Sequence, residues 1–155
     1  MRPLFDKGSV SFYTYIPDKL NIVTKAIEKV QNDCLDEYTA TEAKMRAKSI
    51  IRAELERNGG FVVEDLADKV FEEQPDMRNA FQEKMEKYDM VKQEVIPQNE
   101  TTVRKYQKQH LYTDSGIEIK IPMDCYSDSD RVEFITNPDG TVSVLIKNIG
   151  HLEAK

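Results

Sequence analysis

The stretch of sequence that decides the fold is Thr101–Ile149, TTVRKYQKQHLYTDSGIEIKIPMDCYSDSDRVEFITNPDGTVSVLIKNI. A short basic amphipathic segment opens it, and a strand, an acidic loop and a hairpin follow. Ile117, Ile119 and Ile121 alternate with charged residues. A period of two is typical of a strand with one buried face. The pattern therefore predicts a strand over residues 117–121.

The end of this stretch predicts a β-hairpin. Residues 131–136 and 141–149 are rich in Val and Ile, which favour strands. Asn137-Pro138-Asp139-Gly140 separates them, with Pro at the first central position of a turn and Gly at its end. Two strand-like runs around such a turn indicate an antiparallel pair.

Helical patterns fill the residues before this stretch. Apolar residues recur at helical spacing, and capping or breaking residues bound each run. Thr39 with Glu42 three residues later fits a capping box at the start of the second helix. The predicted elements are an extended lead-in over Pro3–Pro17 and helices over Pro17–Asp33, Thr39–Asn58, Phe61–Glu73 and Met77–Lys92, an extended segment over Gln93–Gln98, and a short helix from Asn99 or Thr101 to about Gln109.

Together these elements predict the α+β class. Four to five helices over about residues 18–109 precede a small antiparallel sheet of three or more strands over about 111–149, which ends in a C-terminal hairpin. The 155 residues fit a single domain over 1–155. A chain of that length can bury a core without disulfides or metals.

Composition argues against a membrane or secreted protein. No apolar run approaches the roughly 20 residues of a membrane span, and the first residues lack the apolar core of a signal peptide. Cys34 and Cys125 are the two cysteines, and free thiols fit a reducing compartment. We therefore expect a cytoplasmic protein.

The acidic charge is concentrated in one region. The formal net charge is -6, and residues 61–100 hold 5 Lys/Arg against 11 Asp/Glu. The remaining residues are neutral overall. A basic surface elsewhere is compatible with this balance, because local clusters decide phosphate binding.

The best candidates for phosphate contact are Arg104, Lys105, Lys108 and Lys120. Arg104 and Lys108 are four residues apart and would share a helix face. Grouped cations bind backbone phosphates and release counterions. The alternative is a solvated helix face, salt-bridged to the acidic region.

A second hypothesis places a helix–turn–helix in residues 47–91, with the helix after Pro75 as the reader. Its candidate DNA contacts are Arg78, Asn79, Gln82, Lys84 and Lys87. Carboxylates on the same two helices would repel phosphates, which favours a structural helical hairpin.

The sequence contains no recognisable catalytic or cofactor motif. The acidic loop with Asp124, Asp128, Asp130 and Glu133 lacks the spacing and glycine of an EF-hand. Its default interpretation is a solvated loop with Asx-turns. His110, His151 and Cys125 do not form a nucleophile–base pattern. We therefore expect no metal, no cofactor and no enzymatic activity.

The order of these elements resembles the C-terminal part of the bacterial nucleoid-associated proteins of the NdpA, 37-kDa type. The resemblance covers roughly Thr41–Lys147. It rests on these pieces: Gly60–Leu66, Lys105 with Leu111, Gly116–Pro122, and Asn137–Thr141 leading to Ile146-Lys147.

The resemblance implies a protein of the bacterial nucleoid that binds DNA. It also implies that this chain is a C-terminal fragment or a short relative of a longer protein. The family offers no contact motif to carry over, so the four cations are predicted from local charge. The alternative function is a protein–protein interaction or oligomerisation module without DNA contact, in which the acidic helices bind a basic partner or a sheet edge pairs with a second copy.

Overall fold

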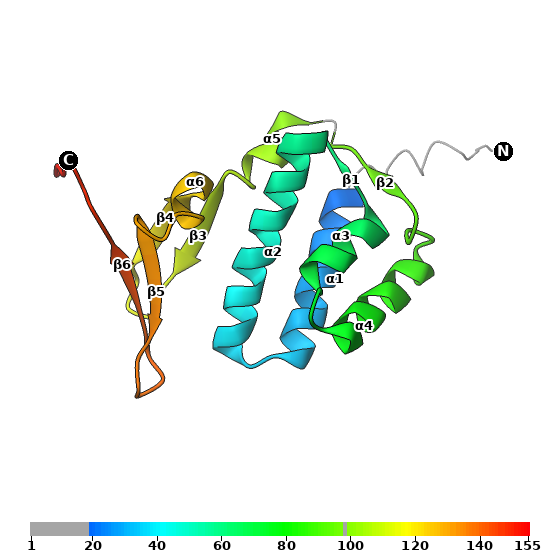
Figure 1. Ribbon diagram of the computed structural model, residues 1–155, viewed down its shortest axis with the longest axis horizontal. Coiled ribbons are helices and arrows are strands. Elements are labelled where there is room, and N and C mark those ends of the chain that lie inside the picture. Colours follow the sequence, from blue (N-terminus) through cyan, green and yellow to red (C-terminus); the bar gives the residue numbers. More distant parts are fainter. Residues whose placement is uncertain (1–18, 98) are drawn as a thin grey trace. The chain divides into compact units, whose positions relative to one another are not determined.

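The computed structural model describes residues 19–97 and 99–155 (Figure 1). The predicted extended segment Pro3–Pro17 lies outside the described residues. The chain divides into two compact units, residues 1–103 (unit 1) and 104–155 (unit 2). Among the described helices, none is both long and apolar enough to cross a membrane.

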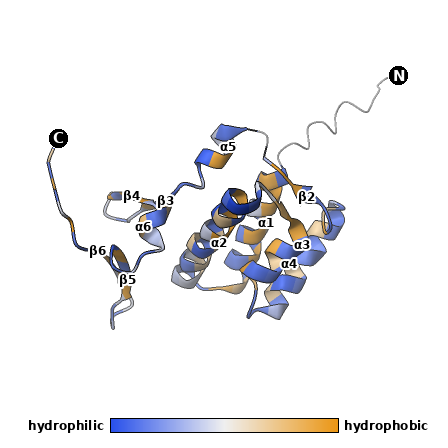
Figure 2. Cartoon of the chain, turned by 45° about the horizontal axis from the view of Figure 1, so that its top comes forward, coloured by the Kyte–Doolittle hydropathy of each residue, from blue (hydrophilic) through white to orange (hydrophobic). Residues whose placement is uncertain are grey.

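Unit 1 is built from helices. Its described elements, in chain order, are α1 (Lys19–Cys34), α2 (Glu37–Asn58), β1 (Phe61–Val62), α3 (Val63–Val70), α4 (Pro75–Lys87), β2 (Glu94–Val95) and α5 (Glu100–Arg104), which spans the division. Both apolar and polar residues occur along α1, α2 and α4 (Figure 2). The apolar faces of these helices form the core together with α3 and Phe71, which follows α3. The largest fully buried side chains include Ile27, Ile51, Leu66, Phe71, Phe81 and Met85.

Helix α2 begins earlier than the sequence predicts. The carboxylate of Asp36 accepts hydrogen bonds from the backbone N–H and the hydroxyl of Thr39, both at 2.9 Å. These bonds lower the pKa of the Asp36 carboxyl, the backbone N–H having the largest effect. The predicted capping box at Thr39 is therefore wrong. The N-cap residue is Asp36, three residues earlier, and its carboxylate accepts the backbone N–H of Thr39. At the other end, Gly59 takes the left-handed conformation (φ 74) and caps the helix.

Phe61 and Val62 form a strand, which corrects the prediction that a helix starts at Phe61. They pair antiparallel with Val95 and Glu94 of β2. The extended segment predicted after residue 92 supplies this partner. Backbone pairing and burial of Phe61 together outweigh the helical period of the sequence. Helix α3 consequently starts at Val63.

Helix α4 starts at Pro75 and ends at Lys87, shorter than predicted. Asp89 adopts a positive φ of 54, and the N–H of Met90 donates a hydrogen bond to the carbonyl of Met85 at 2.9 Å. This turn closes the helix. The apolar period of the sequence places Tyr88 on the inward face with Met77, Phe81 and Met85, but Tyr88 is 62% exposed and Met90 is buried instead.

Unit 2 consists of two antiparallel pairs of strands around a short helix. Its elements are β3 (Lys108–Tyr112), β4 (Glu118–Pro122), α6 (Met123–Tyr126), β5 (Val132–Thr136) and β6 (Val142–Ile146). The α+β class and the closing hairpin are confirmed. The strands form separate two-stranded sheets, β1–β2, β3–β4 and β5–β6, so the expected sheet of three or more strands is wrong for the described residues.

The turn between β5 and β6 is the predicted one. Gly140 has a φ of 87, which favours glycine. The N–H of Asn137 donates to the carbonyl of Thr141 at 2.8 Å. The Asp139 carboxylate accepts from the Thr141 hydroxyl at 2.6 Å, and that bond lowers the pKa of Asp139.

Gly60 and Gly59 provide a matched pair of substitutions. A Cβ at Gly60 would overlap with the carbonyl oxygen of Val95, whereas one at Gly59 meets nothing within 4 Å. We expect Gly60→Ala to lower the free energy of unfolding by about 3 kcal/mol, through overpacking. Gly59→Ala should lower the free energy of unfolding by only about 1 kcal/mol, the cost of a left-handed conformation for a residue with a Cβ. Urea denaturation followed by helical circular dichroism measures both, and equal losses would refute the close approach of β1 and β2.

Candidate nucleic-acid interface

The four predicted cations all belong to unit 2. Arg104 is the last residue of α5, Lys105 follows it, Lys108 opens β3 and Lys120 lies in β4. All four are exposed. Lys120 lies 4.0 Å from the Glu118 carboxylate, whereas Arg104, Lys105 and Lys108 form no ion pair with any residue that the structure describes. They are available to an external anion.

Arg104 and Lys108 do not share a helix face, which corrects the reason first given for grouping them. Helix α5 has only five residues and ends at Arg104. The N–H of Gln107 then closes a turn to the carbonyl of Arg104 at 3.1 Å. A helix this short gains little from propagation. Strand pairing from Lys108 onward replaces the last predicted turn.

The inner face of the β3–β4 hairpin is buried. Gln109 (2% exposed) and Ile121 (4%) lie opposite each other across the two strands. The amide of Gln109 contacts the sulfur of Met123 at 3.4 Å, and the N–H of Met123 donates to the carbonyl of Gln107 at 2.8 Å. These two bonds join the hairpin to the start of α6.

The outer face of the hairpin carries the charges. We call the exposed side chains that alternate with the buried ones the ribbon face: Lys108, His110 and Tyr112 on β3, and Glu118, Lys120 and Pro122 on β4. His110 lies opposite Lys120, and Tyr112 lies opposite Glu118. Side chains directly opposite each other on one face are neighbours. The register therefore brings Lys108 and Lys120 onto one surface.

Glu118 is the acidic residue of the ribbon face. Its carboxylate accepts a hydrogen bond from Nε2 of His110 at 2.8 Å and lies 4.0 Å from Nζ of Lys120. Hydrogen bonds from His110 and Tyr112 lower the pKa of the Glu118 carboxyl. Partial desolvation, and then the bond to Glu118, raise the pKa of Tyr112. The sequence indicated Lys120 but not this network, because pairing across β3 and β4 was not predicted.

The helix–turn–helix candidates lie among carboxylates. Arg78 forms an ion pair with Asp68 of α3. Lys84 and Lys87 line a groove between α1 and α4 that Asp33, Glu83 and Glu86 also line. Asn79 and Gln82 lie on α4, the helix that also carries Glu83 and Glu86. The arrangement favours the structural hairpin over a DNA reader.

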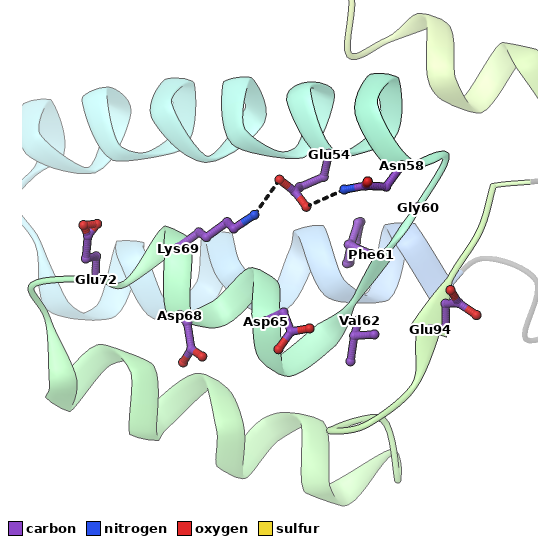
Figure 3. A pocket seen from close by; sticks show the side chains of 10 residues that line it. All are labelled: Glu54, Asn58, Gly60, Phe61, Val62, Asp65, Asp68, Lys69, Glu72 and Glu94. Carbon is purple, nitrogen blue, oxygen red and sulfur yellow. Dashed lines mark hydrogen bonds and ion pairs between the residues drawn. The ribbon is translucent and has the colours of Figure 1, made fainter.

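A pocket of about 580 Å³ in unit 1 is lined largely by acidic residues (Figure 3). The carboxylates are those of Glu54, Asp65, Asp68, Glu72 and Glu94. Glu54 is 8% exposed, and it accepts from Lys69 at 2.7 Å, Arg57 at 3.2 Å and Asn58 at 3.3 Å. The Glu54–Lys69 pair joins α2 to α3. This pocket would repel a phosphate, which leaves unit 2 as the better candidate for DNA.

The predicted acidic loop is only partly a loop: Asp124 lies in helix α6 and Glu133 in strand β5, which leaves Asp128 and Asp130 in the connection between them. The Asp128 carboxylate accepts from the N–H of Asp130 at 2.9 Å, an Asx-turn. Glu133 forms an ion pair with Lys147 at 2.8 Å. In the part of the chain that the structure describes, no group of three or more His, Cys, Asp or Glu could hold a metal ion. Cys34 and Cys125 are free thiols.

The fold defines an α+β protein made of a helical unit and a unit of paired strands. The family model described as nucleoid-associated protein YejK matches residues 18–152. The chain therefore belongs to this family of nucleoid-associated proteins. The match begins before Thr41, where the resemblance in the sequence started. Neither the curated proteins nor the solved structures give a match.

The Glu54–Lys69 pair generates a stability prediction. Lys69→Ala leaves a buried carboxylate with one donor fewer, so we expect a loss of about 1–3 kcal/mol in the free energy of unfolding. The control is Lys29→Ala, which breaks the exposed Lys29–Asp33 pair and should lose less than about 0.5 kcal/mol. Chemical denaturation at neutral pH measures both variants. Similar losses of unfolding free energy in the two variants would show that burial of the Glu54 carboxylate does not require the bond from Lys69.

Proposed function

We propose that this chain binds DNA non-specifically in the bacterial nucleoid, through phosphate contacts from Arg104, Lys105, Lys108 and Lys120 in unit 2. The role is non-catalytic and cytoplasmic. The observation that carries the proposal is the ribbon face, where the register of β3 and β4 brings Lys108 and Lys120 onto one exposed surface. Arg104 and Lys105 precede it directly in the chain.

The charge distribution supports this choice of surface. Unit 2 holds 7 Lys/Arg and 8 Asp/Glu, against 15 and 20 in unit 1. Residues 104–120 hold 4 of those cations and only Asp114 and Glu118 as acids. Phosphate contacts fix position without reading sequence. Membership of the family is consistent with a DNA partner.

The test is fluorescence anisotropy with a labelled duplex at about 50 mM and about 200 mM salt. Four phosphate contacts predict that affinity falls roughly 100-fold across this range, because each contact releases condensed counterions. The variant Arg104→Ala/Lys105→Ala/Lys108→Ala should bind weakly at both salt concentrations and lose most of the salt dependence.

The matched control is Lys25→Ala/Lys29→Ala/Lys92→Ala, which removes three exposed cations from unit 1. It changes the net charge equally and should bind as the wild type does. If the unit 2 variant binds as tightly as the control, the assignment of the four cations is wrong.

A second candidate function is self-association, which β6 favours. Val142–Ile146 contains no charged residue, and Leu145 (46%) and Ile146 (56%) are exposed. Within the described residues, β6 pairs only with β5, so its other edge is open. Natural proteins commonly protect such edges with charges or proline. A second copy pairing antiparallel about Val144 would place Val142 opposite Ile146.

The variant Leu145→Lys tests this pairing, because a charge on the edge strand opposes it. If wild-type protein is a dimer by light scattering, we expect the variant to be monomeric. Tyr88→Lys makes a comparable change at an exposed position of unit 1 and should leave the dimer intact. A monomeric wild type at high concentration would exclude the self-association hypothesis.

A further inference from the structure

An aromatic pair is exposed in the middle of the ribbon face. His110 and Tyr112 are two residues apart on β3, so their side chains leave the same face. Their ring centroids are 4.7 Å apart, with planes tilted by 35°. Tyr112 is 71% exposed, whereas Tyr106, six residues earlier, is 3% exposed. The hairpin therefore exposes an aromatic surface that its own core does not use.

Cations flank this aromatic pair on both strands. Lys108 precedes His110 by two residues on the same face, and Lys120 lies directly opposite His110 on β4. A phosphate held by either lysine would place the attached nucleotide beside the rings. Exposed aromatic side chains between cations are the arrangement with which proteins bind single strands, bases stacking while phosphates pair with Lys or Arg.

We propose that the ribbon face is a stacking platform for unpaired bases, and that the site therefore prefers single-stranded DNA to duplex. This inference rests on the proposed function, since the same lysines supply the phosphate contacts. In a duplex the bases stack on each other and present only their edges in the grooves. An unpaired base presents its π-face, which Tyr112 and His110 can cover.

Glu118 regulates the same platform. Its carboxylate bonds to His110 at 2.8 Å and lies 4.0 Å from the Lys120 ammonium, where an incoming phosphate would also bind. The carboxylate thus holds the histidine ring in place and competes for the lysine. Removing its charge while keeping its shape, by Glu118→Gln, should strengthen DNA binding.

The experiment compares a labelled single-stranded oligothymidylate with a duplex of equal length, by fluorescence anisotropy at one low salt concentration. We expect wild-type protein to bind the single strand more tightly. Tyr112→Ala should weaken single-strand binding by about 10-fold, the usual effect of losing one stacked base, and change duplex binding by less than about 2-fold. Tyr112→Phe keeps the ring and should bind the single strand as the wild type does. Glu118→Gln should bind both probes more tightly.

The outcomes separate this inference from the proposed function. If removal of Arg104, Lys105 and Lys108 abolishes binding to both probes while Tyr112→Ala affects neither, the phosphate contacts stand and the platform is refuted. A duplex preference in the wild type, or equal losses for both probes in Tyr112→Ala, also overturns the platform. If wild-type protein binds neither probe, both proposals fail together.

Discussion

Burial of Gln109 and Ile121 on one side of the β3–β4 hairpin is the constraint on which the candidate site depends. These two residues lie opposite each other and are almost fully buried. Because side chains alternate along a strand, a register shift of one residue would exchange the two faces of the hairpin. The inner face therefore determines that Lys108, His110 and Lys120 meet solvent together. No contact among the cations themselves is needed to gather them.

The charge of the chain is separated between its two units. Unit 1 holds an excess of acidic residues, and several of them line one pocket beside the buried Glu54 (Figure 3). Unit 2 is close to neutral, so nearby carboxylates do not cancel the positive charge of a short run of cations there. Electrostatic attraction acts over roughly a Debye length. The net charge of -6 therefore says little about the potential at the ribbon face.

Strong periodic patterns predicted most of the fold. The helical faces around Ile27 and Ile51 and the alternation of Ile119 and Ile121 appear as expected, since apolar burial decides them. Ile117, predicted to lie in the same strand, precedes it and is 59% exposed. Short elements were harder. Strand β1 forms because β2, which is distant in the sequence, pairs with it, and strand β3 forms because β4 pairs with it across a hairpin. The propensity of one short segment does not identify its pairing partner. Asp36 displaced the predicted cap because several residues near a helix start can accept the same hydrogen bond.

The candidate site was predictable only in part. Local charge singled out Arg104, Lys105, Lys108 and Lys120, and their role in DNA binding remains a prediction. The surroundings of Lys120 depend on the pairing of β3 with β4, which places His110, Tyr112 and Glu118 next to it. These residues are spread over positions 110–120, and their sequence positions alone do not show that they are neighbours. The register of β3 and β4 is needed for that.

Gly60 has a consequence for how this family diverges. Any side chain there would meet the backbone of Val95, which no change of rotamer can move aside. The position therefore accepts only glycine as long as β1 and β2 stay paired. A relative with a larger residue at the aligned position must have separated these strands or shifted their pairing. The residue at this position would therefore distinguish relatives that keep the β1–β2 pairing from relatives that have changed it.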